Sequence, residues 1–359
     1  MTQTGGDTVI EDTSELEDGP ATPGPVKQRP RRRGRSLVAR VRDLLTQHDV
    51  RAAVLPLAAV VLMVAYFGTR ESGFLSVTNM TVMASQAGPL LIVALGATFV
   101  VLMGSIDLSV GAIAGLSAAI AAILLNDAEL GGLVIPLAAV AGAGAGAVNA
   151  FCVTYLRLPS FIVTLGTLSI FAGVTKTVLE GQALLVRDID YGRFANGQLV
   201  PEIPNVLLAG IILWLFMIVL NQRTRFGRYI VAIGAGEQVA QLSGIPVRRY
   251  KTAAFVLSGA MAGLGGAFLL AELGSATPQL GGSYLLEVIA AIVVGGTALT
   301  GGVGAVSRTL LGVVLITILS NGLNVSGVSP WTQEIVTGLV IIVAVLTTLD
   351  RERMQDIIK

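Results

Sequence analysis

Asp107 is the residue whose type and position most directly suggest chemistry. It lies in the segment 104–111 (GSIDLSVG), between two long apolar runs. An ionised aspartate at the centre of a bilayer costs roughly 2.5 to 3.5 kcal/mol, so we expect Asp107 at a membrane interface or facing a watery cavity. It could also cap the helix predicted to begin just after it, and this capping role is the favoured one.

Other polar groups lie within or beside apolar runs. Asn149, Asn321 and Asn324 could each hydrogen-bond across helices, which is the commoner use, or face a polar pathway. Glu272 and Glu287 lie near the ends of two further runs, where solvated carboxylates are expected. None of these side chains forms a paired acid and base at a spacing that catalysis requires.

The residue counts exclude several kinds of site. Cys152 is the only cysteine and His48 the only histidine, which excludes an intramolecular disulfide, a zinc site and a Ser-His-Asp triad. The segment 295–304 (GGTALTGGVG) lacks the Lys-Ser/Thr ending of a phosphate-binding loop. We therefore expect no catalytic residue, no metal, no cofactor and no ATPase in this chain. The glycine-rich segment instead predicts a re-entrant or tight turn, with a flexible connector as the alternative.

The composition places these residues in a membrane protein. The chain is 53% apolar and only 13% charged, with a mean hydropathy of +0.77, whereas soluble domains are about 25% charged. A helix needs about 20 residues to cross about 30 Å of hydrocarbon. The pattern predicts an all-α polytopic bundle of about ten transmembrane helices. The predicted spans are 52–69, 82–103, 108–125, 132–156, 161–179, 205–221, 252–273, 285–301, 306–324 and 332–349.

The first 51 residues differ from the rest of the chain. An acidic stretch from Asp7 to Asp18 precedes several prolines and a basic block from Lys27 to Arg51, a composition typical of disorder. The basic block places the N-terminus in the cytoplasm under the positive-inside rule, and it is either simply solvated or bound to membrane lipid. The predicted divisions are a disordered cytoplasmic tail over 1–51, a transmembrane domain over 52–349 and a short cytoplasmic tail over 350–359.

A short helix is predicted at about 237–243, in the basic loop between the sixth and seventh spans. Glu237 suits a helix N-terminus, Val239 and Leu242 repeat at i, i+3, and Gly244 ends the helix. The loop is either an ordinary positive-inside connection or a docking surface for a cytoplasmic partner.

Several segments together resemble the permease subunits of bacterial ABC importers for monosaccharides, of the ribose, xylose and arabinose type. They occur in the family's order from about residue 52 onward. They are 106–111 (IDLSVG), 161–165 (FIVTL), 224–229 (TRFGRY) continuing to 242–245 (LSGI), 289–291 (IAA) leading into 295–297 (GGT), and 321–324 (NGLN). This chain departs from the family at Gly104-Ser105, where Ser-Gly is usual, and at Glu287, where Asp is common.

The resemblance implies a multi-pass permease of the bacterial plasma membrane. Both termini are expected in the cytoplasm, from the basic block and the even number of predicted spans. The implied partners are an ABC-type ATPase subunit, an external sugar-binding protein, a second copy of the permease and membrane lipid, and no nucleic acid is expected. The implied ATPase-coupling residues are Arg225, Gly227, Arg228, Glu237, Val239, Leu242, Gly244, Arg248 and Arg249. The implied translocation-path residues are Asp107, Ser109, Asn149, Thr164, Asn321 and Asn324.

Two other functions are open at this point. One is a permease for branched-chain amino acids or another small polar solute, against which the segment 321–324 argues. The other is an ion-coupled secondary transporter that works alone. Such a transporter requires intramembrane carboxylates or broken helices at a coupling-ion site, and only Asp107 comes close.

Overall fold

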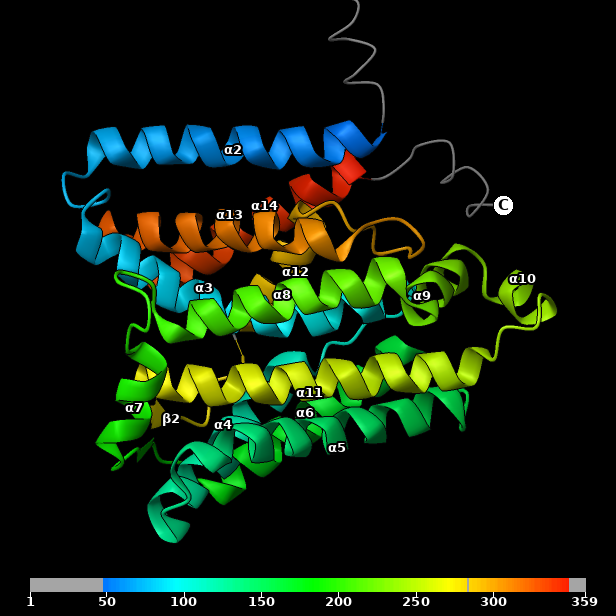
Figure 1. Ribbon diagram of the computed structural model, residues 1–359, viewed down its shortest axis with the longest axis horizontal. Helices are drawn as coiled ribbons and strands as arrows, with labels where there is room; N and C mark the ends of the chain where they lie inside the picture. Colours follow the sequence, from blue (N-terminus) through cyan, green and yellow to red (C-terminus); the bar gives the residue numbers. More distant parts are fainter. Residues whose placement is uncertain (1–47, 283, 349–359) are drawn as a thin grey trace, which may run out of the picture. The chain divides into compact units, whose positions relative to one another are not determined.

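A computed structural model of the chain describes residues 48–282 and 284–348. Long helices run side by side through these residues (Figure 1). The elements in chain order are α2 (His48–Arg70), α3 (Val77–Leu102), α4 (Val110–Ala128), η1 (Gly131–Leu133), α5 (Val134–Thr154), α6 (Ser160–Val178), β1 (Leu184–Leu185), α7 (Ile189–Asn196), α8 (Asn205–Arg223), α9 (Arg225–Ala235), α10 (Glu237–Leu242), α11 (Val247–Leu273), β2 (Ser275–Ala276), α12 (Tyr284–Val294), α13 (Val306–Val325) and α14 (Pro330–Thr348). The predicted tails lie outside the described residues, apart from the beginning of α2.

The predicted all-α membrane fold is confirmed. Within the described residues, seven segments are long and apolar enough to cross a membrane: α3, α4, α5 together with η1, α6, α8, α11 and α13. Three shorter apolar helices, Val54–Arg70, Tyr284–Val294 and Pro330–Leu346, correspond to the first, eighth and tenth predicted spans. The total of ten crossings stays a prediction.

The eighth predicted span, 285–301, is wrong as a continuous helix. The helix α12 has 11 residues, a length of about 16 Å, so the helix alone covers about half of the roughly 30 Å of hydrocarbon. Gly295 and the positive φ of Gly296 end it, and a glycine-rich turn leads to α13. The predicted span extends too far because no charged residue or proline lies between Val294 and Arg308 to mark its end.

The helix α11 is central to the bundle and packs against α3, α4 and α5. Its contact with α5 depends on glycines, because a Cβ atom on Gly142 would lie 2.2 Å from the carbonyl oxygen of Gly259, and one on Gly259 would lie equally close to that of Gly142. Gly263, one turn further along α11, approaches Ala138 in the same way. Small residues four apart allow two membrane helices to pack backbone against backbone.

The bundle has two distinguishable ends, which are called the α7 end and the α10 end (Figure 1). At the α7 end, β1 pairs antiparallel with β2, and the side chain of Asn126 at the end of α4 bonds to the backbone of Leu185 and Arg187. These bonds attach the connection between α6 and α8 to the helical bundle.

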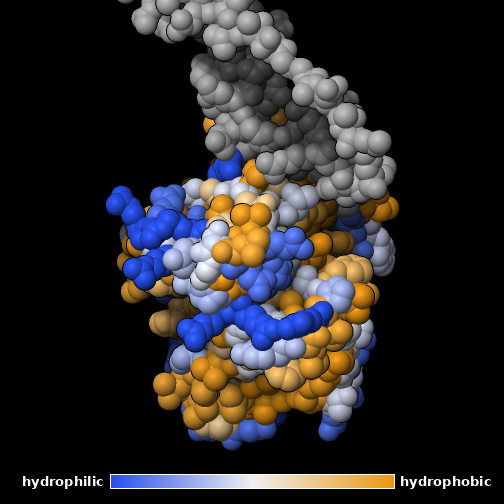
Figure 2. Space-filling model, turned by 90° about the vertical axis from the view of Figure 1, so that its right-hand side faces the viewer, coloured by the Kyte–Doolittle hydropathy of each residue, from blue (hydrophilic) through white to orange (hydrophobic). Residues whose placement is uncertain are grey.

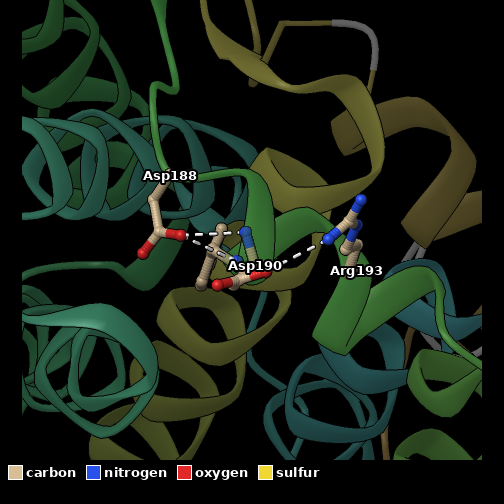
Figure 3. Close-up of polar contacts among 4 residues, drawn as sticks. Asp188, Asp190 and Arg193 are labelled. Atoms are coloured by element: carbon tan, nitrogen blue, oxygen red, sulfur yellow. Dashed lines mark hydrogen bonds and ion pairs between the residues drawn. The ribbon is translucent and has the colours of Figure 1, made fainter.

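The helix α7 is held by local polar contacts. The Asp188 carboxylate accepts hydrogen bonds from the backbone N–H groups of Asp190 and Tyr191, and Arg193 lies 3.5 Å from Asp190 (Figure 3). The Tyr191 hydroxyl donates to the Ala267 carbonyl in α11 at 2.7 Å. Burial raises the pKa of this hydroxyl, so it remains a protonated donor that fixes α7 to the bundle.

Candidate functional site

Asp107 lies in the interior of the bundle, in the turn between α3 and α4. It is 5% exposed. Its Oδ1 accepts hydrogen bonds from the backbone N–H of Ser109 at 3.0 Å and from the Ser109 hydroxyl at 2.6 Å, and its Oδ2 accepts from Ser258 in α11 at 3.4 Å. Asp107 therefore orders the turn that leads into α4. It does not cap the first turn of α4, whose N-cap residue is Ser109.

This carboxylate is one end of a buried chain of hydrogen bonds, here called the Asp107 network. The Asn149 amide donates to the Ser109 hydroxyl at 2.7 Å, and Thr167 donates to the Asn149 carbonyl oxygen at 2.7 Å. Asn149 and Ser109 are fully buried. The network joins α5, α6 and α11 to the turn before α4, so its members fix helices to one another.

Thr164 belongs to the same region but makes a different contact. Its hydroxyl lies 3.1 Å from the Ile106 carbonyl oxygen, and the Ser160 hydroxyl accepts from the Ile106 N–H at 3.2 Å. The start of α6 is thereby attached to the turn that contains Asp107. Four of the six predicted path residues therefore lie in one buried polar region that links helices.

The other two predicted path residues, Asn321 and Asn324, lie towards the α7 end on α13. Asn321 exchanges two amide hydrogen bonds with Asn79 in α3, at 2.9 and 3.1 Å. This reciprocal pair is the cross-helix use expected of membrane asparagines. Both residues also line a cavity of about 230 Å³, here called the α7-end cavity.

The α7-end cavity contains two carboxylates that were not among the predicted path residues. Glu272 and Glu287 were expected to be solvated, but both are half-buried and line this cavity together with Tyr284. The remaining lining residues are Gln86, Leu90, Leu269, Ile316, Thr317, Ser320, Asn321, Asn324 and Gln333. Carboxylates placed inside apolar runs were the available signal, since buried ionisable residues in membrane segments commonly mark functional sites.

At the α10 end, the structure brings the predicted coupling residues together on α9, α10 and the first turn of α11. The predicted short helix is confirmed as α10, followed by Gly244 at a positive φ of 81°. Val239 and Leu242 on α10 are 69% and 89% exposed. Glu237 pairs with Lys251 of α11 at 2.7 Å, which holds the short helix against the bundle.

The predicted basic coupling residues are all exposed. They are Arg225, Arg228, Arg248 and Arg249, whereas Gly227 is buried against the backbone of Asn221. Hydrophilic residues surround hydrophobic patches on the face of the molecule that includes α10 (Figure 2). A cavity of about 950 Å³ opens beside α10 and is lined by Arg157, Glu237, Arg248 and Arg249 among others. We call the exposed residues of α9, α10 and the first turn of α11 the coupling surface, after the role predicted for them.

The glycine-rich turn between α12 and α13 contacts the coupling surface through backbone atoms. Gly302 donates to the Leu102 carbonyl at the end of α3 at 2.9 Å. A Cβ atom on Gly301 would lie 2.5 Å from Gly104, and one on Gly234 in α9 would lie 2.4 Å from the Gly302 nitrogen. The ends of α3 and α9 and the turn before α13 therefore meet without intervening side chains.

Similarity to known proteins shows the family to which the chain belongs. Residues 79–345 match the family described as "Branched-chain amino acid transport system / permease component". The chain belongs to this permease family. The predicted resemblance is confirmed, because the curated relatives include import permeases for sugars.

The relatives match along most of their length. The ribose import permease of Bacillus subtilis (strain 168) is 40% identical over 304 residues, which is 83% of this chain and 92% of the relative. The ribose import permease of Escherichia coli (strain K12) is 37% identical over 295 residues, with shares of 81% and 91%. The galactose/methyl galactoside import permease of Haemophilus influenzae is 32% identical over 325 residues, with shares of 84% and 94%. No solved structure matches the chain.

Proposed function

We propose that this permease is the membrane subunit of an ABC importer that moves a monosaccharide across the bacterial plasma membrane. The observation that carries the proposal is the 37 to 40% identity, over more than four-fifths of the chain, to ribose import permeases. The family description names branched-chain amino acids, but relatives for ribose, galactose and allose favour a sugar.

The driving force comes from an ATPase on a separate chain, which docks on the coupling surface. Val239 and Leu242 support this assignment, because they present apolar side chains at an end of the bundle that is otherwise rich in arginine. Exposed apolar groups surrounded by polar ones commonly mark partner surfaces. The α10 end is then cytoplasmic and the α7 end external, in agreement with the positive-inside rule.

Movement of the docked ATPase reaches the bundle through the glycine contacts behind the coupling surface. Gly234, at the end of α9, touches both the end of α3 and the turn before α13. Backbone atoms in direct contact leave little free volume to absorb a displacement, so a shift of α9 and α10 displaces α3 and α13. An external binding protein delivers the sugar at the opposite end.

Two copies of the permease form the working transporter, as the family resemblance implies. Light scattering of the purified permease in lipid nanodiscs measures the number of copies directly. A mass equal to two permease chains is expected, and a mass equal to one would contradict the dimer.

Reconstituted transport tests the main proposal. The permease is placed in vesicles with its partner ATPase and sugar-binding protein, and uptake of labelled ribose, galactose, allose and leucine is followed with and without ATP. ATP-dependent uptake of a sugar is expected. Uptake of leucine alone would favour the amino-acid permease, and uptake driven by an ion gradient without ATP would favour the secondary transporter.

A further inference from the structure

The α7-end cavity holds two hydroxyl groups without a hydrogen-bond partner among the described residues. Tyr284 and Thr317 line the cavity and are only 9% and 6% exposed, yet neither hydroxyl makes a hydrogen bond within the described residues. A buried polar group without a partner costs about 1 to 3 kcal/mol. Retention of two such groups in one cavity indicates a ligand that bonds to them.

Two carboxylates line the same cavity without a counter-charge. Glu272 comes from α11 and Glu287 from α12, and no lysine or arginine is among the described residues that line the cavity. Neither carboxylate forms an ion pair or accepts a hydrogen bond within the described part of the chain. Carboxylates in such a position bind strongly to a ligand that can donate hydrogen bonds.

The remaining lining groups determine the chemistry of that ligand. Gln86 and Asn324 carry amides that both donate and accept, in addition to the two hydroxyls. A bare cation would use only the oxygen acceptors, whereas a neutral polyhydroxylated molecule can use the donors as well. Leu90 and Leu269 provide apolar surface for the carbon side of such a molecule.

The size of the cavity limits the ligand to a small one. Its volume of about 230 Å³ equals roughly eight water molecules at about 30 Å³ each. This is below the range of about 300 to 1,000 Å³ that is usual for drug-sized ligands. A single sugar ring therefore suits the cavity better than an oligosaccharide.

We propose that the α7-end cavity is a monosaccharide-binding site within a single permease chain, which accepts the sugar before it crosses the bilayer. The site rests on the proposed sugar import. Glu272 and Glu287 accept hydrogen bonds from the sugar hydroxyls, while Tyr284 and Thr317 gain the partners that they lack.

The test measures sugar binding by the full permease with its ATPase in nanodiscs, without ATP and without the binding protein. Labelled ribose, galactose and allose are the probes, and saturable binding of at least one is expected. Tyr284→Phe and Thr317→Val each remove one neutral hydrogen bond and should weaken that binding roughly two- to tenfold. Glu272→Gln and Glu287→Gln each remove a charge-assisted bond and should weaken it about ten- to a hundredfold.

A matched control and a stability measurement separate ligand binding from folding. Glu180→Gln changes an exposed carboxylate outside the cavity and should leave sugar affinity unchanged. Because Tyr284 and Thr317 have unbonded hydroxyls, Tyr284→Phe and Thr317→Val should keep or raise the unfolding temperature without sugar while reducing the increase that sugar causes. A lower unfolding temperature without sugar, together with unchanged sugar affinity, would overturn the site.

Failure of the site and failure of the proposed function give different results. ATP-dependent sugar uptake without saturable binding of any of the three sugars would overturn the site and leave the proposed function standing. Stabilisation by NaCl, KCl or CaCl₂ that depends on Glu272 and Glu287, with no effect of sugar, would also overturn it in favour of a cation site. Saturable binding without ATP-dependent uptake would support the site and contradict the proposed function.

Discussion

At the scale of single residues, Asn149 connects three parts of the bundle. Its amide bonds to Ser109 and accepts from Thr167, so one side chain on α5 holds α6 and the turn before α4. Cross-helix hydrogen bonds in membrane proteins contribute about 0.6 kcal/mol on average and up to about 1.7 kcal/mol. The structural importance of Asn149 lies in making two such bonds from a fully buried position.

Asn149→Ala should lower the free energy of unfolding by about 1 to 2 kcal/mol, because both hydrogen bonds are lost. Denaturant titration in mixed micelles measures this change in the free energy of unfolding. Thr167→Val should destabilise less, and the double variant should lose less than the sum of the two because they share one bond. Thr177→Val is the control, since its exposed hydroxyl bonds only within its own helix. Full additivity of the two buried substitutions would contradict the Asp107 network.

Leu242 on the coupling surface gives the second prediction at this scale. Leu242→Asp would place an unpaired carboxylate in the proposed contact and should weaken ATPase binding by about 2 kcal/mol, roughly thirtyfold. Membrane insertion should survive, because Leu242 is 89% exposed on a helix outside the spans. Copurification with the ATPase and sugar uptake, measured on the same preparation, should fall together. Normal yields of the complex with both Leu242→Asp and Glu237→Lys would show that the loop is only a connector.

At the scale of elements, the contact between α5 and α11 depends on which glycines face the partner helix. Gly142 faces α11, and an added Cβ atom there would overlap the backbone of Gly259. Gly144 lies two residues away on the same helix, is exposed and has nothing within 4 Å of such a Cβ position. Alanine substitutions at Gly142 and Gly144 therefore separate the effect of helix packing from the effect of helix propensity, because both residues lie on α5.

Gly142→Ala should reduce the yield of folded protein, because α5 and α11 must move apart. Gly144→Ala should be neutral or stabilising, since alanine favours the helix over glycine by about 1 kcal/mol. Fluorescence-detected size exclusion of both variants, expressed in parallel, gives the yield of folded protein. Equal yields would mean that the two helices do not pack as closely as described.

At the scale of the whole molecule, charge sets the orientation in the membrane. The basic block from Lys27 to Arg51 and the tail 351–359 flank the apolar region, and the arginines of the coupling surface lie at one end of it. We predict that both termini are cytoplasmic. Reporter fusions to each terminus measure this, and an external signal from either would contradict the proposed orientation.

The acidic stretch from Asp7 to Asp18 gives the last prediction. Its composition offers little apolar surface to bury, so deletion of residues 1–25 should leave uptake within about twofold of the full chain. The deletion retains the basic block, which is predicted to orient the protein. Sugar uptake per inserted molecule is the measurement, and a loss of insertion or uptake would reveal a role for the tail.

The sequence by itself determined the fold class, the positions of the apolar helices and the family. These follow from local properties, because hydropathy, glycine and proline positions, and short motifs act over neighbouring residues. It also predicted α10 closely, since Glu237 and Gly244 mark the two ends of the helix. The early end of α12 was missed, because no charged residue or proline follows Val294 before Arg308.

Only the tertiary structure decided which polar residues act together. Asp107 and Asn149 are 42 positions apart yet belong to one hydrogen-bonded chain, while Asn321 lies in a separate cavity. Glu272 and Glu287 resemble solvated residues at span ends when each is considered alone. Both carboxylates line one cavity with Tyr284 and Thr317 because of the way in which α11, α12 and α13 pack. Such packing results from contacts between distant segments, which no local pattern of residues encodes.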